Sequence, residues 1–375
     1  MIDTVNIAVQ YHERPLWYSS IHKRINSGYG KGGVFTAHIR PRYEERTYKR
    51  EGIYLPKLRY VERPRTQSRS KTYELYIELS LTKLYFGNNF SELTDNMFSA
   101  VVNVLSEALL DIYDVSVSPT EIEQATVSRI DYSKNIVFTD RTPVSTIINT
   151  LATAEVPKTY DMQNTNHKNG GQTYHIHTNS IDIVLYDKVA DLRQAKVSEK
   201  RSYEEDNYTQ LNLINEFDKH PNVTIPRWEI RLIGRRRIRQ ELNTIGVNEN
   251  LQLNHLFSSD ISRKVLLLHW QKIIDRIPYS EAKADTASQI LVAYKQSNPD
   301  MKFSKASALT LMQLLRNEQS ERAVRNVIEG LFSRAQYYQL KKKTRNPVKV
   351  TKSKDLLHIT ETLTQMIPVS IDDII

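Results

Sequence analysis

Alternating apolar and polar residues predict strands in five parts of the chain. In the run RWEIRLI, Trp228, Ile230 and Leu232 alternate with charged residues, so a strand there has one apolar and one charged face. The other four stretches are residues 3–10, 73–81, 125–138 and 172–189. The last contains a turn at Asn179 and Ser180 and therefore predicts a hairpin.

Apolar residues at helical spacing occupy much of the rest. Residues 91–113 predict a helix with Ser91 as its N-cap, and the run RRRIRQEL after the last strand predicts a short basic helix. Residues 161–171 are polar with two glycines and predict a loop. Beyond about residue 246 the periodic segments are helical. We therefore expect an α+β protein with an antiparallel sheet domain in residues 1–245 and a mainly helical domain in residues 246–375.

The polar faces of four predicted strands carry groups that suit chemistry at a phosphate. Because side chains alternate along a strand, Arg129 and Asp131 share one face, opposite Ile130. If the four polar faces converge, one side of the sheet holds Glu78, Arg129, Asp131, Asp182, Tyr186, Lys188, Arg227, Glu229 and Arg231. Amphipathic strands with outward charges also occur in any half-exposed sheet, so the pattern leaves this alternative open.

The chemistry predicted for such a cluster is metal-assisted attack on a phosphodiester. Glu78, Asp131 and Glu229 supply hard oxygen ligands for Mg²⁺ or Mn²⁺. The oxygen of Tyr186 can act as the nucleophile. Lys188 can neutralise charge on the phosphorus or lower the tyrosine pKa.

The His175-Ile176-His177 sequence offers reserve metal ligands. Its spacing places both imidazoles on one strand face, as in the HUH nucleases. An H-x-H sequence on a hairpin is also common by chance. Tyr186 follows only nine residues later, whereas the tyrosine of HUH proteins lies further on, in a helix.

The charge distribution favours a polyanionic partner. The net charge is +9, and residues 40–71 combine eleven Lys or Arg with four Tyr and four Glu. Cations can hold phosphates and aromatic rings can stack on unpaired bases. An exposed hairpin whose tyrosines pack on the sheet is the alternative. A second basic element, Arg235, Arg236, Arg237 and Arg239, follows the strand of Glu229, which predicts a phosphate contact near the metal.

Two absences narrow the class of protein. The chain has no cysteine, which excludes disulfides, thiolate metal sites and cysteine nucleophiles and fits a reducing cytoplasm. No apolar run approaches the length of a membrane helix, and the N-terminus lacks the features of a signal peptide.

Several segments resemble, in order, the gene II/X replication initiators of filamentous phages. These are the opening MID and the runs IELSLTKLYFGNN, ATVSRIDYS, VLYDKVADL, VTIPRWEIRLIGRRRIRQELNTIGV and LTLMQLLRNEQSERAVRNVIEGL. Plasmid rolling-circle initiators are similar around the Y-D-K run. The resemblance implies a Rep-type nuclease domain in which Tyr186 is the active tyrosine, Lys188 its companion lysine, and Glu78, Asp131 and Glu229 the acidic positions. It does not require His175 or His177, and residues 40–71 do not match it.

What the resemblance implies is initiation of rolling-circle replication. Tyr186 would nick origin DNA and leave a 5′-phosphotyrosine and a free 3′-OH, with closure by a second transesterification. Arg129, Arg227, Arg231 and the four arginines after residue 234 would contact double- or single-stranded origin DNA. A host helicase and DNA polymerase are the implied partners, in the host cytoplasm. The alternatives are a non-catalytic origin-binding protein and a conjugative relaxase.

Overall fold

The computed structural model describes residues 1–30, 33–64, 71–152, 154, 156, 161–166, 172–195, 217, 219–220, 222–277, 287–318, 321–343 and 354–370. These residues form one ten-stranded antiparallel sheet in the order β2-β3-β4-β5-β1-β6-β10-β9-β8-β7. The strands are β1 (Ile2–Tyr11), β2 (Ile25–Tyr29), β3 (Phe35–Ile39), β4 (Lys57–Pro64), β5 (Lys71–Ser80), β6 (Thr126–Asn135), β7 (Asp161–Asn166), β8 (Gln172–His177), β9 (Ile181–Asp187) and β10 (Pro226–Ile233). The predicted α+β class is confirmed.

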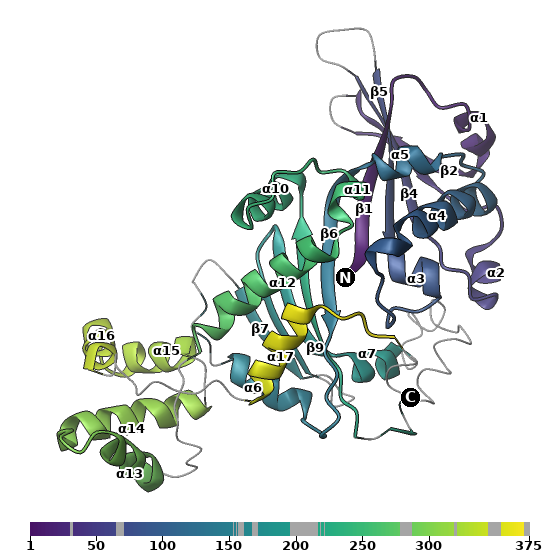
Figure 1. Ribbon diagram of the computed structural model, residues 1–375. Coiled ribbons are helices and arrows are strands. Elements are labelled where there is room, and N and C mark those ends of the chain that lie inside the picture. Colours follow the sequence, from purple (N-terminus) through teal and green to yellow (C-terminus); the bar gives the residue numbers. More distant parts are fainter. Residues whose placement is uncertain are drawn as a thin grey trace.

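Helices surround the sheet, and most of them cover its apolar face. They are α1 (Tyr18–Ile21), η1 (His22–Arg24), α2 (Glu45–Arg50), α3 (Leu81–Phe86), η3 (Asp95–Met97), α4 (Phe98–Tyr113), α5 (Pro119–Glu123), α6 (Val144–Ala152), α7 (Lys188–Ala195), α10 (Arg235–Thr244), α11 (Leu253–Leu256), α12 (Ser259–Ile274) and α17 (Lys354–Gln365). In Figure 1, α4, α12 and α17 lie in front of the strands. The indole of Trp228 on β10 packs edge-on against that of Trp270 on α12, with ring centroids 5.4 Å apart. One hydrophobic core therefore joins the sheet to these helices.

This core crosses the boundary predicted at residue 245. Leu256, Val265 and Ile359 from the helical part belong to the same buried cluster as Ile130 and Ile230 of the sheet. Two smaller clusters lie within α13 (Ala287–Ser297), α14 (Phe303–Glu318), α15 (Glu321–Leu331) and α16 (Arg334–Lys343). The boundary expected at residue 245 therefore does not separate two hydrophobic cores, because α11, α12 and α17 bury their apolar faces against the sheet.

A second contact ties the end of the described chain to β6. The ammonium of Lys134, fully buried, lies 2.5 Å from a carboxylate oxygen of Glu92 and donates to the carbonyl of Ile367 at 2.6 Å. Glu92 and Val369 also exchange hydrogen bonds, the Val369 N–H donating to the Glu92 carboxylate and the Glu92 N–H to the Val369 carbonyl. Residues 367–369 thus satisfy a charged pair in the interior of the fold.

Three local predictions need correction. The helix predicted over 91–113 begins at Phe98, because the Asn88 side chain accepts hydrogen bonds from the N–H groups of Phe90 and Ser91 and holds a turn there. Residues 161–166 form the edge strand β7 instead of a loop. The hairpin strand ends at Asp187, and the Asp187 carboxylate accepts a hydrogen bond from the Ala190 N–H, which starts α7 at Lys188.

Candidate active site

Four neighbouring strands bring polar side chains into rows on the sheet face opposite the main helical layer. Directly paired residues share a face, so β6, β10, β9 and β8 form rows across the sheet. One row contains Asp131, Arg231, Asp182 and His177, the next Ser133, Glu229, Val184 and His175, and the third Asn135, Arg227, Tyr186 and Thr173. The predicted convergence of polar faces is therefore present for these strands.

Glu229 lies at the centre of this group. Its side chain is only 4% exposed, and Arg231 donates to it at 2.7 Å. The Tyr186 hydroxyl donates to its other carboxylate oxygen, Oε2, at 3.4 Å. The Arg227 guanidinium lies 3.8 Å from the same oxygen. One carboxylate thus connects the tyrosine to two arginines.

Burial decides the acidity of Tyr186. It raises the pKa of the phenol well above its ordinary value; the positive charge of Arg227 opposes that shift and the negative charge of Glu229 adds to it. The tyrosine is therefore a neutral phenol near pH 7. It needs a proton acceptor and nearby positive charge before its oxygen can attack a phosphorus atom.

Arg227 lies inside the protein. Its guanidinium is 3.2 Å from the Asp3 carboxylate and donates to the Ser133 hydroxyl at 2.7 Å and to the Asn89 carbonyl at 2.6 Å. It is 2% exposed, so it is poorly placed for the predicted surface contact with DNA and instead supplies positive charge beside Tyr186.

Asp3 is a site residue that sequence reasoning missed. It pairs with Arg227 and accepts hydrogen bonds from the hydroxyls of Ser80 and Thr82, both at 3.0 Å. These contacts outweigh burial and lower the pKa of Asp3, so its charge persists at neutral pH. The only signal in the sequence was the opening MID, which was part of the resemblance but was not assigned a role.

Lys188 lies close to Tyr186 although it is not on the strand as predicted. It is the first residue of α7, is buried, and its Nζ lies 5.8 Å from the centre of the Tyr186 ring. Burial and the charge of Arg227 lower the pKa of Lys188 to about 8, against the opposing effect of Asp191 at 3.7 Å. Lys188 is thus a cation whose charge can change near neutral pH.

Asp131 and Glu229 form a pair of carboxylates on neighbouring strands. Arg129 donates twice to Asp131, at 3.0 and 2.8 Å. Burial nevertheless raises the pKa of Asp131 to about 7, and the charge of Glu229 adds to the rise. Two carboxylates that resist simultaneous ionisation are a suitable place for a divalent cation, which would relieve their repulsion.

Glu78 does not join this pair. It lies on β5, separated from β6 by β1, and its half-exposed carboxylate pairs with Lys57 at 3.3 Å. Within the described ranges, no three His, Asp or Glu side chains form a group that could hold a metal ion. The residues still fit Mg²⁺, which is often held by one or two carboxylates and completed by water and substrate phosphate.

His175 and His177 occupy the same face of the sheet. Their rings are 4.9 Å apart, and His175 Nε2 lies 3.7 Å from the Asp182 carboxylate. The group in contact with the Tyr186 hydroxyl is the Glu229 carboxylate. The arrangement therefore resembles a carboxylate site more than the HUH type.

The arginines of α10 lie away from Tyr186. The helix starts after Gly234, whose φ of +90° allows the sharp turn out of β10, whereas Tyr186 pairs with Arg227 at the other end of that strand, about 20 Å away. Ile238 and Leu242 of α10 enter the main core, and Arg237 pairs with Glu241 at 2.5 Å. The expectation that this helix holds a phosphate beside the metal is not met. Arg235 is half-buried, and Arg236 and Arg239 are exposed.

The site is accessible from the polar face of the sheet. Arg129 and Arg231 keep about a third of their side-chain surface exposed, and Tyr186 is half-buried.

None of the described helices is long and apolar enough to cross a membrane.

Comparison with known proteins adds one finding. Residues 1–252 match the model of a family described as the N-terminal part of a replication-associated protein, of the filamentous-phage gene II type. No curated protein and no solved structure matches the chain.

Proposed function

The chain belongs to the family of replication-associated proteins of the filamentous-phage gene II type, and from this premise we propose that it initiates rolling-circle replication by nicking one strand of origin DNA with Tyr186. The observation that carries the proposal is the contact between the Tyr186 hydroxyl and Glu229, beside the buried cations Arg227 and Lys188. A structural tyrosine would not need a carboxylate at its hydroxyl together with one cation 5.8 Å from its ring centre and another beside that carboxylate.

The first step is a transesterification. The Tyr186 oxygen attacks the scissile phosphorus and its proton passes to Glu229 Oε2, the atom to which the hydroxyl already donates. The bond from phosphorus to the 3′ oxygen breaks, and this oxygen takes up a proton from water. The products are a 5′-phosphotyrosine and a free 3′-OH, and the reverse type of attack by a 3′-OH on the phosphotyrosine closes a strand.

The protein's cations stabilise charge during this step. Lys188, 5.8 Å from the centre of the Tyr186 ring, and Arg227, whose charge favours the ionised phenol, would stabilise the negative charge that develops on the tyrosine oxygen and the phosphate. A Mg²⁺ or Mn²⁺ ion held by Asp131 and Glu229 would polarise the phosphate when bound. Without the ion, Arg129 pairs with Asp131 and Arg231 with Glu229. With the ion bound, both arginines would be able to contact the incoming phosphate.

The proposal implies partners and a setting. Host polymerase extends the 3′-OH, a host helicase separates the strands, and the reaction takes place on DNA in the host cytoplasm.

A covalent adduct tests the proposal. The protein is incubated with Mg²⁺ and single-stranded oligonucleotides tiled across the replicon that encodes it, then separated on a denaturing gel. We expect one tile to yield a protein–DNA species, with mass spectrometry locating the phosphate on Tyr186, and EDTA to prevent it. Specific binding of a tile without any adduct would favour the non-catalytic origin-binding alternative.

A further inference from the structure

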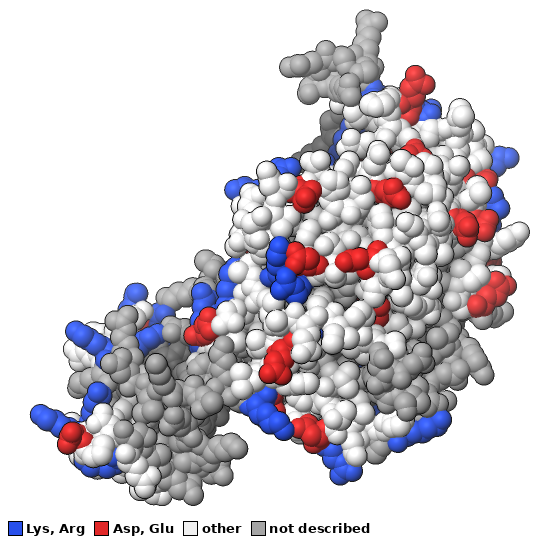
Figure 2. Space-filling model, viewed as in Figure 1, with Lys and Arg blue, Asp and Glu red and all other residues white. Residues whose placement is uncertain are grey.

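The helices α13 to α16 form a lobe of unusual charge. Residues 287–343 contain ten Lys or Arg and four Asp or Glu, so less than a sixth of the chain carries six of its nine net positive charges. Figure 1 shows these helices beside the sheet, and the described charged side chains over the lobe in Figure 2 are mostly basic. Such a concentration of charge favours contact with a polyanion.

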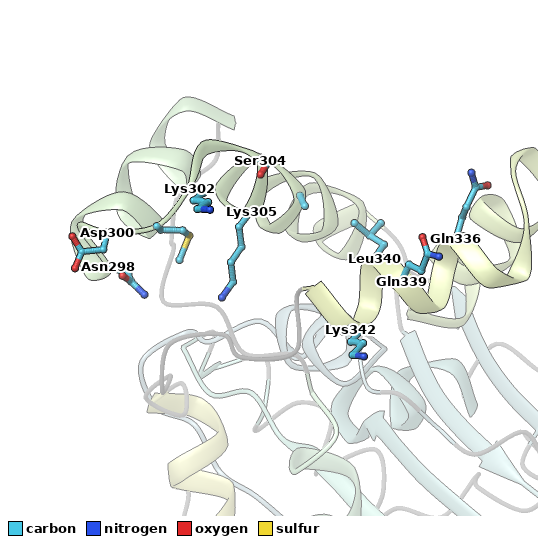
Figure 3. A pocket seen from close by; sticks show the side chains of 11 residues that line it. Asn298, Asp300, Lys302, Ser304, Lys305, Gln336, Gln339, Leu340 and Lys342 are labelled. Atoms are coloured by element: carbon cyan, nitrogen blue, oxygen red, sulfur yellow. The ribbon is translucent and has the colours of Figure 1, made fainter.

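The lobe contains a hollow of about 670 Å³ between the start of α14 and α16. Lys302 and Lys305 line it at the α14 side and Lys342 near the end of α16, and the side chain of Lys305 extends away from its helix (Figure 3). The amides of Asn298 and Gln339 contribute neutral donors and acceptors, and Asp300 is the one carboxylate among the residues that line the hollow.

The three lysines are available to a ligand. Lys302, Lys305 and Lys342 are exposed and make no salt bridge with any residue in the described part of the chain. A neighbouring lysine, Lys295, donates to the carbonyls of Pro299 and Met301 at 2.5 and 3.2 Å. This contact holds the connection between α13 and α14, so the rim of the hollow is fixed before a ligand arrives.

We propose that this hollow binds the sugar–phosphate backbone of single-stranded DNA, as a second DNA site apart from Tyr186. The inference rests on the proposed function in one respect, that the protein acts on DNA. Three lysines around a concave surface match successive phosphates, and side-chain amides suit bases without selecting a sequence. A hollow of about 670 Å³ has room for a short stretch of a single strand, whose flexible backbone can follow a concave surface. The site would hold the strand that a nick releases.

Salt-dependent binding tests the proposal on the full chain. The full chain is titrated into a labelled oligo-dT of about thirty nucleotides at several salt concentrations, and binding is followed by fluorescence anisotropy. One variant combines Lys302→Gln, Lys305→Gln and Lys342→Gln. The matched control combines Lys23→Gln, Lys272→Gln and Lys354→Gln, three exposed lysines elsewhere, so that both variants lose the same charge.

We expect the log–log salt slope to fall by about 2 in the hollow variant, because each single-strand phosphate contact contributes about 0.7. The control should keep the wild-type slope. Equal slopes in the hollow variant and the wild type, or equal losses in both variants, would overturn the proposal. A parallel titration measures the affinity for dTTP. If the hollow variant loses affinity for dTTP but keeps the wild-type oligo-dT slope, the hollow is a nucleotide site and the proposal is overturned.

A second measurement separates this inference from the proposed nicking. The Tyr186 adduct is measured with an oligonucleotide of about ten residues that spans only the cleavage position. Both triple variants should form it as the wild type does. Failure of the wild type to form any adduct contradicts the nicking proposal alone, because the salt slopes are measured without it.

Discussion

The hydroxyl of Tyr186 donates a 3.4 Å hydrogen bond to Glu229 across the β9–β10 pair. Tyr186 pairs directly with Arg227, so the phenol reaches Glu229 diagonally, two positions along the neighbouring strand. Diagonal contacts of this kind are within reach of long side chains in an antiparallel pair. The relation between the proposed nucleophile and its proposed proton acceptor is thus set by the register of two central strands.

Replacing Tyr186 with phenylalanine should abolish the adduct and leave DNA affinity unchanged. Only the phenolic oxygen is removed, so the rate should fall by at least about a thousandfold. Tyr76→Phe is the control, since that tyrosine lies on β5 and its hydroxyl donates to Glu74. An adduct in Tyr186→Phe would move the nucleophile elsewhere. Tyr132 and Tyr174 are poor substitutes because both are fully buried on the opposite, apolar face.

Divalent ions should stabilise the protein through Asp131 and Glu229. At an ion concentration about a hundred times the dissociation constant, Mg²⁺ or Mn²⁺ should add about 2.7 kcal/mol, seen as a rise in melting temperature relative to EDTA. Asp131→Asn and Glu229→Gln should lose this rise. Glu78→Gln should keep it, because Glu78 pairs with Lys57 away from the site. If Glu78→Gln also loses the metal-dependent rise in melting temperature, Glu78 is a metal ligand after all.

The adduct rate should fall as pH rises through about 8. Burial lowers the pKa of Lys188 to about 8, so Lys188 is positive below that pH and neutral above it. If the positive form stabilises the phosphate, alkaline solution removes it; the tyrosine pKa lies well above this window and adds no compensating step. Single-turnover rates from about pH 6.5 to about pH 9.5 measure this across the Lys188 transition.

Lys188→Arg provides the control for that profile. Arginine stays charged throughout the range, so the fall near pH 8 should disappear. A profile that falls in the same way in both proteins would assign the transition to a different group.

Asp3→Asn should slow the adduct step about tenfold without weakening DNA binding. Asp3 fixes Arg227 by an ion pair at 3.2 Å, and Arg227 favours the ionised form of Tyr186. The pair is buried, so the variant should also lose several kcal/mol of stability, and rates are compared well below its melting temperature. Ser80→Ala removes one hydrogen bond to Asp3 and should have a smaller effect in the same direction. A normal rate in stable Asp3→Asn would limit Asp3 to folding.

The α10 arginines should divide into two groups. Arg236→Gln with Arg239→Gln should lower the salt slope of DNA binding by about 1.4 to 1.8 and leave the melting temperature unchanged, since both side chains are exposed. Arg237→Gln should lower the melting temperature, because Arg237 pairs with Glu241, which also bonds His269. An unchanged slope in the double variant would mean that α10 does not contact DNA.

The strand pattern predicted the polar face of the site because alternation survives in the central strands. Asp131, Tyr186 and Glu229 share a face, as alternation predicted. Alternation does not predict the register between the strands, which only the structure provides. The sheet order was not predictable, and it separates Glu78 from the pair by placing β1 between β5 and β6. Periodicity within a strand says which residues share a face, but not which strands are neighbours.

What the pattern could not supply are contacts between residues distant in sequence. Trp228 and Trp270 join a strand to a helix that the pattern assigned to another domain. Asp3 gains its role only through Arg227, more than two hundred residues later. The direction of α10 depends on the turn at Gly234, which carries the arginines away from the tyrosine end of β10.

The bond between Lys134 and the Ile367 carbonyl spans 233 residues. At synthesis rates of about 5 to 20 residues per second, roughly 10 to 50 s pass between the appearance of the two partners. During that interval the ammonium of Lys134 has Glu92 but not its backbone acceptor, and the apolar face of the central strands lacks α12 until residue 274 is made and α17 until residue 365 is made. The nascent chain therefore exposes apolar sheet surface until α17, the last of the described helices, has been synthesised. A chain cut after residue 252 would keep that apolar surface exposed.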